Sequence, residues 1–264
     1  MDKRIATGVV AGAGFVALLA AGGWAFAALL ALMALIGYWE FARLNGLSVR
    51  LPEVWAGLAA TLVLATPAWP FGWTTPAPLP VVWILAFLLL AATVVRENRF
   101  HLGHAAALFL GAVYIGFGFR SMALVREAED GLFWAAAAFA CIWGADIGGY
   151  FAGRAFGRRK LWPAISPNKT VEGFAGGLAV AVLAAFAAAW IWPGPMGFGQ
   201  AVLFGLAAGV AGPLGDLIQS AYKRHSGVKD AGRLLPGHGG VLDRTDSWLI
   251  AFPVLQLFAL LPGA

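Results

Sequence analysis

The segment 213–247 carries acidic residues at spacings that suit phosphate chemistry. Asp216 and Ser220 are one helical turn apart, and Asp243 and Asp246 are three residues apart, so each pair would share a helix face. Carboxylates on two facing helices form an oxygen cage suited to Mg²⁺, which binds phosphates through one or two carboxylates. The spacing therefore predicts a metal site at Asp216, Asp243 and Asp246.

Basic residues and a glycine-rich run lie between these acids. Lys and Arg side chains bind phosphate oxygens. The run Pro-Gly-His-Gly-Gly at 236–240 lets bare backbone approach a ligand and supplies N–H donors. The same cations can be the ordinary mark of a cytoplasmic loop, and the glycines can form a plain turn. The basic residues are Lys223, Arg224, Lys229 and Arg233.

A second polar loop, 154–171, precedes another apolar stretch. Ser166-Pro167 or Asn168 is expected to cap the helix that follows, with Pro167 near its first turn. The helix N-terminus would then offer N–H groups and partial positive charge to a phosphate. The plainer interpretation is that Ser166 only caps the helix and Lys169 only faces solvent.

Several acids lie where lipid disfavours charge. A charge at mid-bilayer costs at least about 2.5–3.5 kcal/mol, so such residues are usually functional or paired. Glu40 is a separate case: it lies one turn from Arg43, and a simple ion pair is expected there. The acids within or at the cytoplasmic edge of the last four apolar stretches are Asp146, Glu172, Asp216 and Asp246.

Nine apolar stretches must position these residues. A transmembrane helix needs about 20 such residues, and a segment that spans lipid alone must be helical. The expected fold is an all-α, polytopic transmembrane helical bundle of about nine spans. It is a single integral-membrane domain over 1–264, with a helical scaffold at 1–125 and a catalytic half at 130–264. The stretches are roughly 5–21, 23–43, 54–71, 80–97, 104–123, 132–153, 172–193, 200–222 and 246–262.

Composition and charge placement agree with a membrane protein. The chain is 61% hydrophobic and 12% charged, whereas soluble domains are about 45–50% apolar and about 25% charged. With the N-terminus in the cytoplasm, all Lys and Arg residues except Arg120 and Arg126 fall on the inside. This predicts a bacterial inner-membrane protein with its active site on the cytoplasmic side. No nucleic-acid partner is expected, and the single cysteine, Cys141, is expected to be a buried hydrophobe.

Glycines spaced by four recur in the late stretches. They predict close helix packing, and glycine-lined faces would also permit a homodimer. The pairs are Gly144/Gly148, Gly149/Gly153, Gly173/Gly177 and Gly205/Gly209.

The late motifs resemble the phosphatidate cytidylyltransferase (CDP-diacylglycerol synthase) family. The pattern from Asp146 to Gly173 is also similar, whereas the first half resembles the family only in its hydrophobic spans. Tyr222 departs from the usual aliphatic residue or Phe, and Asn168 stands where Lys is common. The signature residues are Ser220, Lys223-Arg224, Lys229-Asp230, Pro236-Gly237-His238-Gly239-Gly240 and Asp243-Arg244-Thr245-Asp246.

The resemblance implies that CTP and phosphatidate react to give CDP-diacylglycerol and pyrophosphate. It also implies Mg²⁺, and it allows a second cation, for which a monovalent ion is one option. The metal ligands would be Asp146, Asp216, Asp243 and Asp246. The catalytic set would be Asp216, Asp243, Asp246, Lys223 and Arg224. Substrate binding would use Ser166, Lys169, Ser220, Lys229, Asp230, His238, Gly239, Gly240 and Arg244.

Two alternatives stay open. A CTP-dependent membrane lipid kinase, such as a polyprenol kinase, would also use metal and basic loops, but it would release CDP instead of pyrophosphate. A non-enzymatic ion-coupled transporter would carry intramembrane acids too. It predicts acids near mid-membrane and modest cytoplasmic loops, unlike the long basic loops of this chain.

Overall fold

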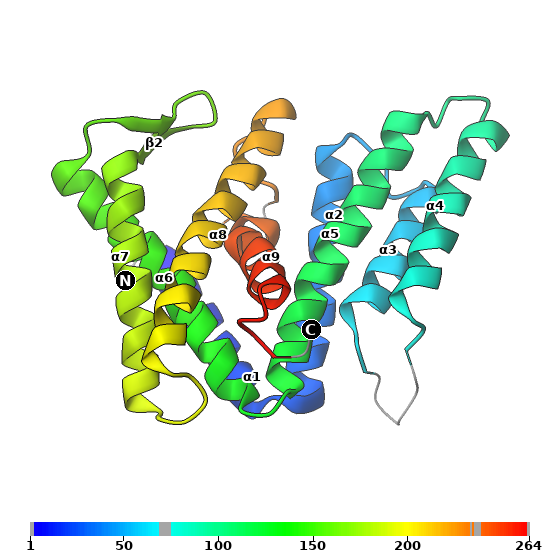
Figure 1. The fold of residues 1–264 in the computed structure, drawn as a ribbon. Helices are drawn as coiled ribbons and strands as arrows, with labels where there is room; N and C mark the ends of the chain where they lie inside the picture. Colours follow the sequence, from blue (N-terminus) through cyan, green and yellow to red (C-terminus); the bar gives the residue numbers. More distant parts are fainter. Residues whose placement is uncertain (1–2, 69–74, 233, 235–238, 263–264) are drawn as a thin grey trace. The chain divides into compact units, whose positions relative to one another are not determined.

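The computed structural model describes residues 3–68, 75–232, 234 and 239–262 (Figure 1). Each of the nine apolar stretches contains a helix, so the predominantly helical fold is confirmed. A short hairpin of β1 (Lys160–Trp162) and β2 (Ser166–Thr170) was not predicted. The helices are α1 (Lys3–Ala21), α2 (Gly23–Leu44), α3 (Pro52–Ala65), α4 (Pro78–Val95), α5 (Leu102–Glu127), α6 (Gly131–Phe156), α7 (Val171–Ile191), α8 (Phe198–His225) and α9 (Leu242–Leu257).

Six of the described helices are long and apolar enough to cross a membrane: α2, α4, α5, α6, α7 and α8. The apolar segment Gly8–Ala21 of α1 and the helix α3 are shorter. α9 has 16 residues, a rise of about 24 Å against the roughly 30 Å hydrocarbon core. The chain is therefore a multi-pass membrane protein by length and composition.

The chain divides into two compact units. The first contains Met1–Ala123 and Asp230–Arg244, and the second contains Leu124–Lys229 and Thr245–Ala264. The segment Asp230–Arg244 thus packs with the N-terminal unit, although it lies late in the sequence.

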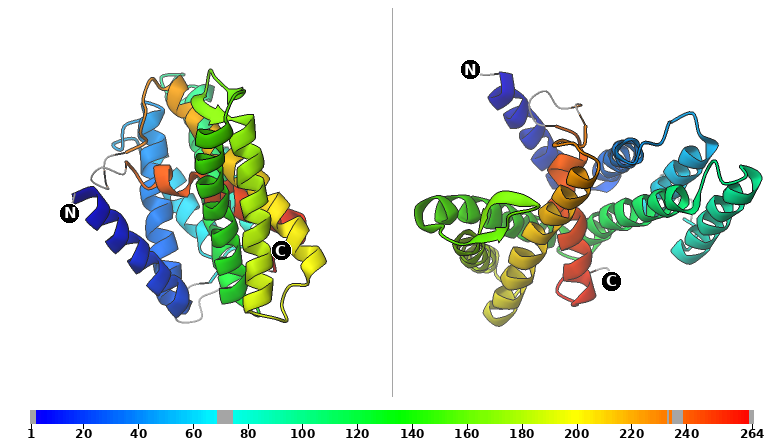
Figure 2. Two further views of the ribbon diagram at one scale, coloured as in Figure 1. Left: turned by 90° about the vertical axis from the view of Figure 1, so that its left-hand side faces the viewer. Right: turned by 90° about the horizontal axis from the view of Figure 1, so that it is seen from above.

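Glycine allows the helices of the second unit to pack closely. α6 lies along α7, and α7 packs against α8 (Figure 2). A Cβ atom on Gly173 would lie 2.8 Å from the carbonyl oxygen of Gly149, and one on Gly205 would lie 2.9 Å from the backbone nitrogen of Val182. These contacts confirm the predicted close packing and place the glycines within the chain's own core.

The start of α7 differs from the expectation. Ser166–Thr170 form strand β2, antiparallel to β1, and Thr170 is the N-cap residue. Its Oγ1 accepts a hydrogen bond from the backbone N–H of Gly173 at 3.0 Å. The predicted cap at Ser166 or Asn168 is therefore wrong. Pro167 lies in a two-stranded hairpin, where a missing N–H is tolerated, and it does not lie in the first helical turn.

In the first unit, α2 packs against α1 and α3, and α3 packs against α4. Tyr38 of α2 is fully buried, and it lies against Gly57 of α3, where a Cβ atom would collide with its ring. Glu53 of α3 is 8% exposed, and its Oε1 accepts a hydrogen bond from Arg96 Nε at 3.0 Å. α4 turns large apolar side chains such as Trp83 and Phe87 outward, as expected for a lipid-facing helix.

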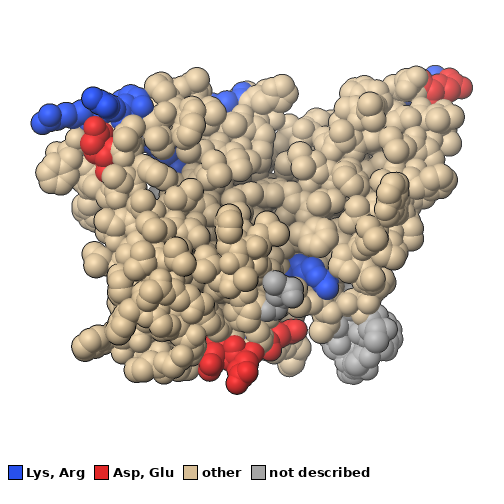
Figure 3. Space-filling model, viewed as in Figure 1, with Lys and Arg blue, Asp and Glu red and all other residues tan. Residues whose placement is uncertain are grey.

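Charge is distributed unevenly along the second unit. Lys and Arg gather on the hairpin end, while Asp and Glu gather by the turn between α5 and α6 (Figure 3). The exposed basic residues near the C-terminal end of α6 are Arg154, Arg158, Arg159 and Lys160. The exposed acids before its N-terminal end are Glu127, Glu129 and Asp130. The two ends of α6 therefore carry opposite charge.

Candidate active site

Three of the predicted acidic residues meet in the second unit. Asp146 projects from α6, Asp216 from α8 and Asp246 from α9. Asp146 interacts electrostatically with Asp216, and Asp246 interacts electrostatically with both. Three helices that are distant in the sequence thus bring three carboxylates into one cluster, which we call the carboxylate cluster.

Glu172 has a different task. Its carboxylate accepts hydrogen bonds from the backbone N–H groups of Arg158, at 2.9 Å, and Arg159, at 3.2 Å. These bonds tie the chain that leaves α6 to the first turn of α7. Glu172 therefore fixes the segment that leads from α6 into the hairpin.

One face of α8 supplies further polar groups. Asp216, Ser220 and Lys223 follow at steps of four and three residues, so they line one side of the helix. Ser220 Oγ donates a hydrogen bond to Asp216 Oδ1 at 3.2 Å, which confirms that the two residues share a helix face. Lys223 is 8% exposed and interacts electrostatically with Asp246. A buried cation therefore lies beside one acid of the cluster.

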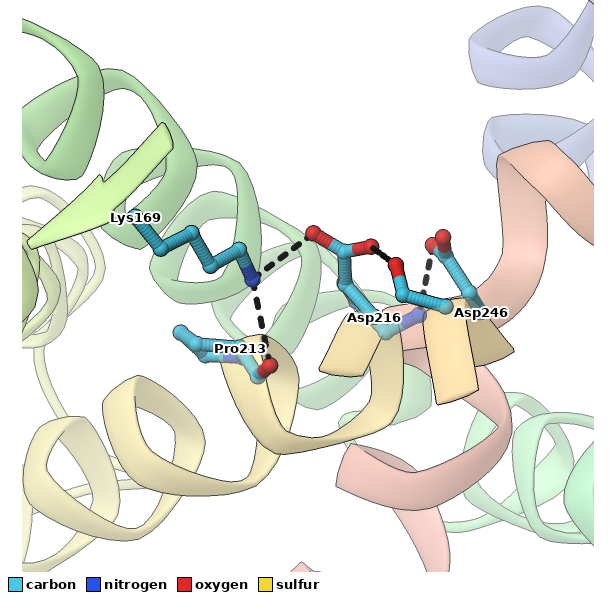
Figure 4. A network of polar contacts seen from close by, with 6 residues as sticks. Lys169, Pro213, Asp216 and Asp246 are labelled. Atoms are coloured by element: carbon cyan, nitrogen blue, oxygen red, sulfur yellow. Dashed lines mark hydrogen bonds and ion pairs between the residues drawn. The ribbon is translucent and has the colours of Figure 1, made fainter. Parts of the chain in front are cut away.

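The hairpin adds a second cation. Lys169 Nζ lies 2.7 Å from Asp216 Oδ2 and donates a hydrogen bond to the carbonyl oxygen of Pro213 at 3.3 Å (Figure 4). Burial rises along the end of β2, where Asn168 is exposed, Lys169 is half-buried and Thr170 is buried. The interpretation in which Lys169 only faces solvent is wrong.

Gly215 lets α9 approach α8 at this point. A Cβ atom on Gly215 would collide with the carbonyl oxygen of Asp246 and would lie 3.0 Å from Ser247 Cα. The Asp246 carboxylate accepts a hydrogen bond from the N–H of Ser247 at 2.8 Å (Figure 4). The close backbone contact therefore sets the distance between Asp246 and the neighbouring Asp216.

The donor chemistry of the cluster fits a hard cation. Carboxylate and hydroxyl oxygens are the ligands that Mg²⁺ prefers. Beside Asp216, however, the ammonium group of Lys169 occupies a position where a metal ion could bind. Among the residues that the structure describes, no three His, Cys, Asp or Glu side chains are arranged to hold one ion. A metal would therefore share the cluster with Lys169 or replace it at Asp216.

Asp243 belongs to the first unit. It is 9% exposed, and its Oδ2 accepts hydrogen bonds from the N–H groups of Ala231, at 2.8 Å, and Gly240, at 2.9 Å. Gly239 has φ +82°, and a Cβ atom there would lie 2.6 Å from Asp243 Oδ2. Asp243 thus fixes the backbone of the glycine-rich segment 239–242 at Gly240. The place of Asp243 among the metal ligands stays a prediction.

Glu40 holds the same segment from α2. Its Oε1 accepts a hydrogen bond from the N–H of Val241 at 3.0 Å, and its Oε2 accepts one from the N–H of Leu242 at 2.9 Å. Arg43 contributes to its electrostatics, but the expected simple pair with Arg43 is not the main contact. The sequence could not reveal these partners, because they lie 201 and 202 residues away.

The remaining predicted site residues lie on the surface or at element ends. Arg224 is exposed and donates a hydrogen bond to the carbonyl oxygen of Val228 at 3.1 Å, just beyond α8. Ser166 begins β2 and is half-buried, and Arg244 is exposed on the first turn of α9. Lys229 and Asp230 are exposed, and His238 lies outside the described residues.

Comparison with known proteins covers nearly the whole chain. The model of the Cytidylyltransferase family matches residues 2–261. A protein of Staphylococcus haemolyticus named phosphatidate cytidylyltransferase is 36% identical over 258 residues, which is 97% of this chain and 98% of that protein. A protein of the same name from Bacillus subtilis is 38% identical over 258 residues, 97% of this chain and 96% of that protein.

Proposed function

The chain belongs to the cytidylyltransferase family, and from this premise we propose that it converts CTP and phosphatidate into CDP-diacylglycerol and pyrophosphate. The observation that carries the proposal is the carboxylate cluster of Asp146, Asp216 and Asp246, which includes the cations Lys169 and Lys223. Relatives that carry this activity in their names align with 97% of the chain.

The reaction is a displacement at phosphorus. A phosphate oxygen of phosphatidate forms a bond to the α-phosphorus of CTP, the bond from that phosphorus to the bridging oxygen breaks, and pyrophosphate leaves with the electron pair. The attacking oxygen is already ionised near neutral pH, so no strong general base is required. The main obstacle is the repulsion between two polyanions.

The cations of the site lower this repulsion. Lys169 and Lys223 are held beside carboxylates, so their ammonium groups are fixed in position before substrate binds. Fixed charges of this kind stabilise charge that develops in a transition state. The Ser220 hydroxyl is a further donor to phosphate oxygens.

Asp216 and Asp246 would hold Mg²⁺ together with phosphate oxygens of the substrates, with Asp146 supporting the site electrostatically. When bound, Mg²⁺ neutralises phosphate charge and orients the oxygens of the substrates. The family resemblance adds Asp243 to this set. Loss of activity in a chelator and its return with added Mg²⁺ are the expected results, and full activity in the chelator would contradict the assignment.

We also propose a bundle of about nine spans in the bacterial inner membrane, with the N-terminus and the carboxylate cluster on the cytoplasmic side. The basic hairpin end and the acidic α5–α6 turn of the second unit support this orientation. CTP would then arrive from the cytoplasm while phosphatidate comes from the bilayer.

An assay of the purified protein with labelled CTP, phosphatidate and Mg²⁺ tests the activity. CDP-diacylglycerol and pyrophosphate should form in equal amounts, and Asp216→Asn should lower the rate at least about 100-fold, since it removes a charged partner of Lys169 and a metal ligand. Asp130→Asn is a matched control, because Asp130 is exposed, adopts the left-handed conformation that Asn accepts, and precedes α6.

Product analysis separates the alternatives. Release of CDP in place of pyrophosphate would indicate a CTP-dependent lipid kinase. Absence of any CTP turnover, with ion-dependent uptake in vesicles, would indicate a transporter. Either result would refute the proposed reaction.

A further inference from the structure

We infer that Glu40 is a positioning residue: its carboxylate clamps the glycine-rich segment 239–242 and thereby sets the conformation that this segment presents to substrate. The inference rests on the proposed function for its link to CTP, although the clamp itself is a feature of the first unit alone. It gives α2, which carries none of the family signature, a direct part in shaping the site.

The hydrogen bonds of Glu40 define the clamp. Each of its carboxylate oxygens accepts one backbone N–H, from Val241 and Leu242, at the start of α9. The first N–H groups of a helix have no acceptor within the helix, so a carboxylate is well suited to bind them at this position. Glu40 is 7% exposed, so these bonds compete little with water and are stronger than surface bonds.

The shape of the backbone around Glu40 is a second, independent observation. A Cβ atom on Gly232 would collide with Glu40 Oε1, and a Cβ atom on Gly240 would collide with the whole carboxylate. The two glycines leave a cradle that this carboxylate fills. The glycines of the segment are therefore placed for contact with Glu40 as well as for backbone flexibility.

Asp243 completes the arrangement from the other side. Its Oδ2 accepts hydrogen bonds from the N–H groups of Ala231 and Gly240. The backbone at Gly240 is therefore fixed by Asp243, while the Cα hydrogen that a side chain would replace faces Glu40. Glu40 and Asp243 repel one another electrostatically. Each carboxylate accepts two backbone N–H groups of its own, and these hydrogen bonds offset the repulsion. Removal of either carboxylate would release the segment.

Hydrogen–deuterium exchange of Glu40→Gln tests the clamp without relying on activity. An amide side chain can accept from only one of the two N–H groups and places its own NH₂ against the other. Exchange in the peptide that covers Val241 and Leu242 should rise at least about 10-fold, while peptides from α6 and α7 should be unchanged. Unaltered exchange at Val241 and Leu242 would overturn the inference.

Kinetics separate positioning from general destabilisation. Glu40→Gln should raise the KM for CTP about 10-fold or more, since CTP binding must then order the segment, with the KM for phosphatidate little changed. Glu53→Gln is the matched control: Glu53 is an equally buried glutamate of the same unit, but its partner is Arg96. A fall in kcat alone, equal to that of Glu53→Gln, would mean that Glu40 only supports folding.

A double-mutant cycle tests the cradle. Gly240→Ala alone should be severe, because the added methyl group meets the Glu40 carboxylate, and Glu40→Ala should remove that clash. The double variant should therefore be no worse than about threefold below the poorer single variant. Additive losses would contradict a direct contact. If the wild-type protein makes no CDP-diacylglycerol, the proposed function fails, whereas the exchange measurement still decides the clamp.

Discussion

Lys169 shows how one side chain links the hairpin to the carboxylate cluster. It is the residue before the N-cap of α7, so the cap at Thr170 and the extended strand together fix where its ammonium group lies. The group then contacts both the Asp216 carboxylate and the Pro213 carbonyl oxygen. A cation held by two α8 acceptors is placed before substrate arrives.

Lys169→Ala should lower kcat/KM about 10- to 100-fold, because it removes a charge-assisted contact to Asp216 and a fixed cation. Asn168→Ala is the control, since the neighbouring side chain is exposed on the other side of the strand. Its rate should stay within about twofold of the wild type, as for most surface substitutions. Equal losses in both variants would mean that only the hairpin fold matters.

The sequence predicts local residue geometry better than distant partners. The shared helix face of Asp216 and Ser220 follows from the helical repeat, and the structure confirms it. The N–H partners of Glu40 lie about 200 residues away at the start of α9, whereas the nearby Arg43 suggests a simpler partner. Local spacing predicts contacts within a helix, whereas contacts between helices depend on packing that periodicity alone does not specify.

At the scale of the element, hydrophobic length predicts helices well and short strands poorly. All nine apolar stretches contain helices because lipid leaves few other options for such segments. The hairpin was missed because its strands have three and five residues and β2 includes Pro167 and Asn168, residues that rarely favour strands. Its closure depends on Glu172 and on the cap at Thr170.

Gly215 is the point where α9 touches α8, and Gly215→Ala should separate them. The added methyl group would collide with the Asp246 carbonyl oxygen, so we expect a destabilisation of about 1–3 kcal/mol and a rate reduced at least about 10-fold. Gly199→Ala is the control, because Gly199 lies in the first turn of the same helix with open space around it. Thermal unfolding in detergent and the transferase assay provide the two measurements.

At the scale of the whole molecule, charge placement predicts orientation in the membrane. The one cysteine, Cys141, is fully buried, so single cysteines can be introduced after Cys141→Ala with little background. A membrane-impermeant thiol reagent applied from the cytoplasmic side should label Arg159→Cys and leave Glu129→Cys unlabelled. Labelling of both from the same side would refute the proposed orientation.

The number of spans is harder to predict than the number of helices. Six of the described helices meet the length and hydropathy expected of a span, while α3, with 14 residues, and α9, with 16, are shorter. The sequence placed the third stretch at 54–71, but α3 ends at Ala65, and residues 69–74 lie outside the described part. The orientation experiment, extended to the ends of α3 and α9, would establish which helices cross.

The distance in sequence between Glu40 and its backbone partners has a consequence for biosynthesis. Translation runs from the N-terminus, so Glu40 leaves the ribosome about 200 residues before Val241 and Leu242. Until Val241 and Leu242 are synthesised, the Glu40 carboxylate cannot form these two hydrogen bonds, although α2 has already reached the insertion machinery. A chain that stops before α9 would keep that acid unsatisfied, and membrane quality-control proteases should remove it faster than the full-length chain.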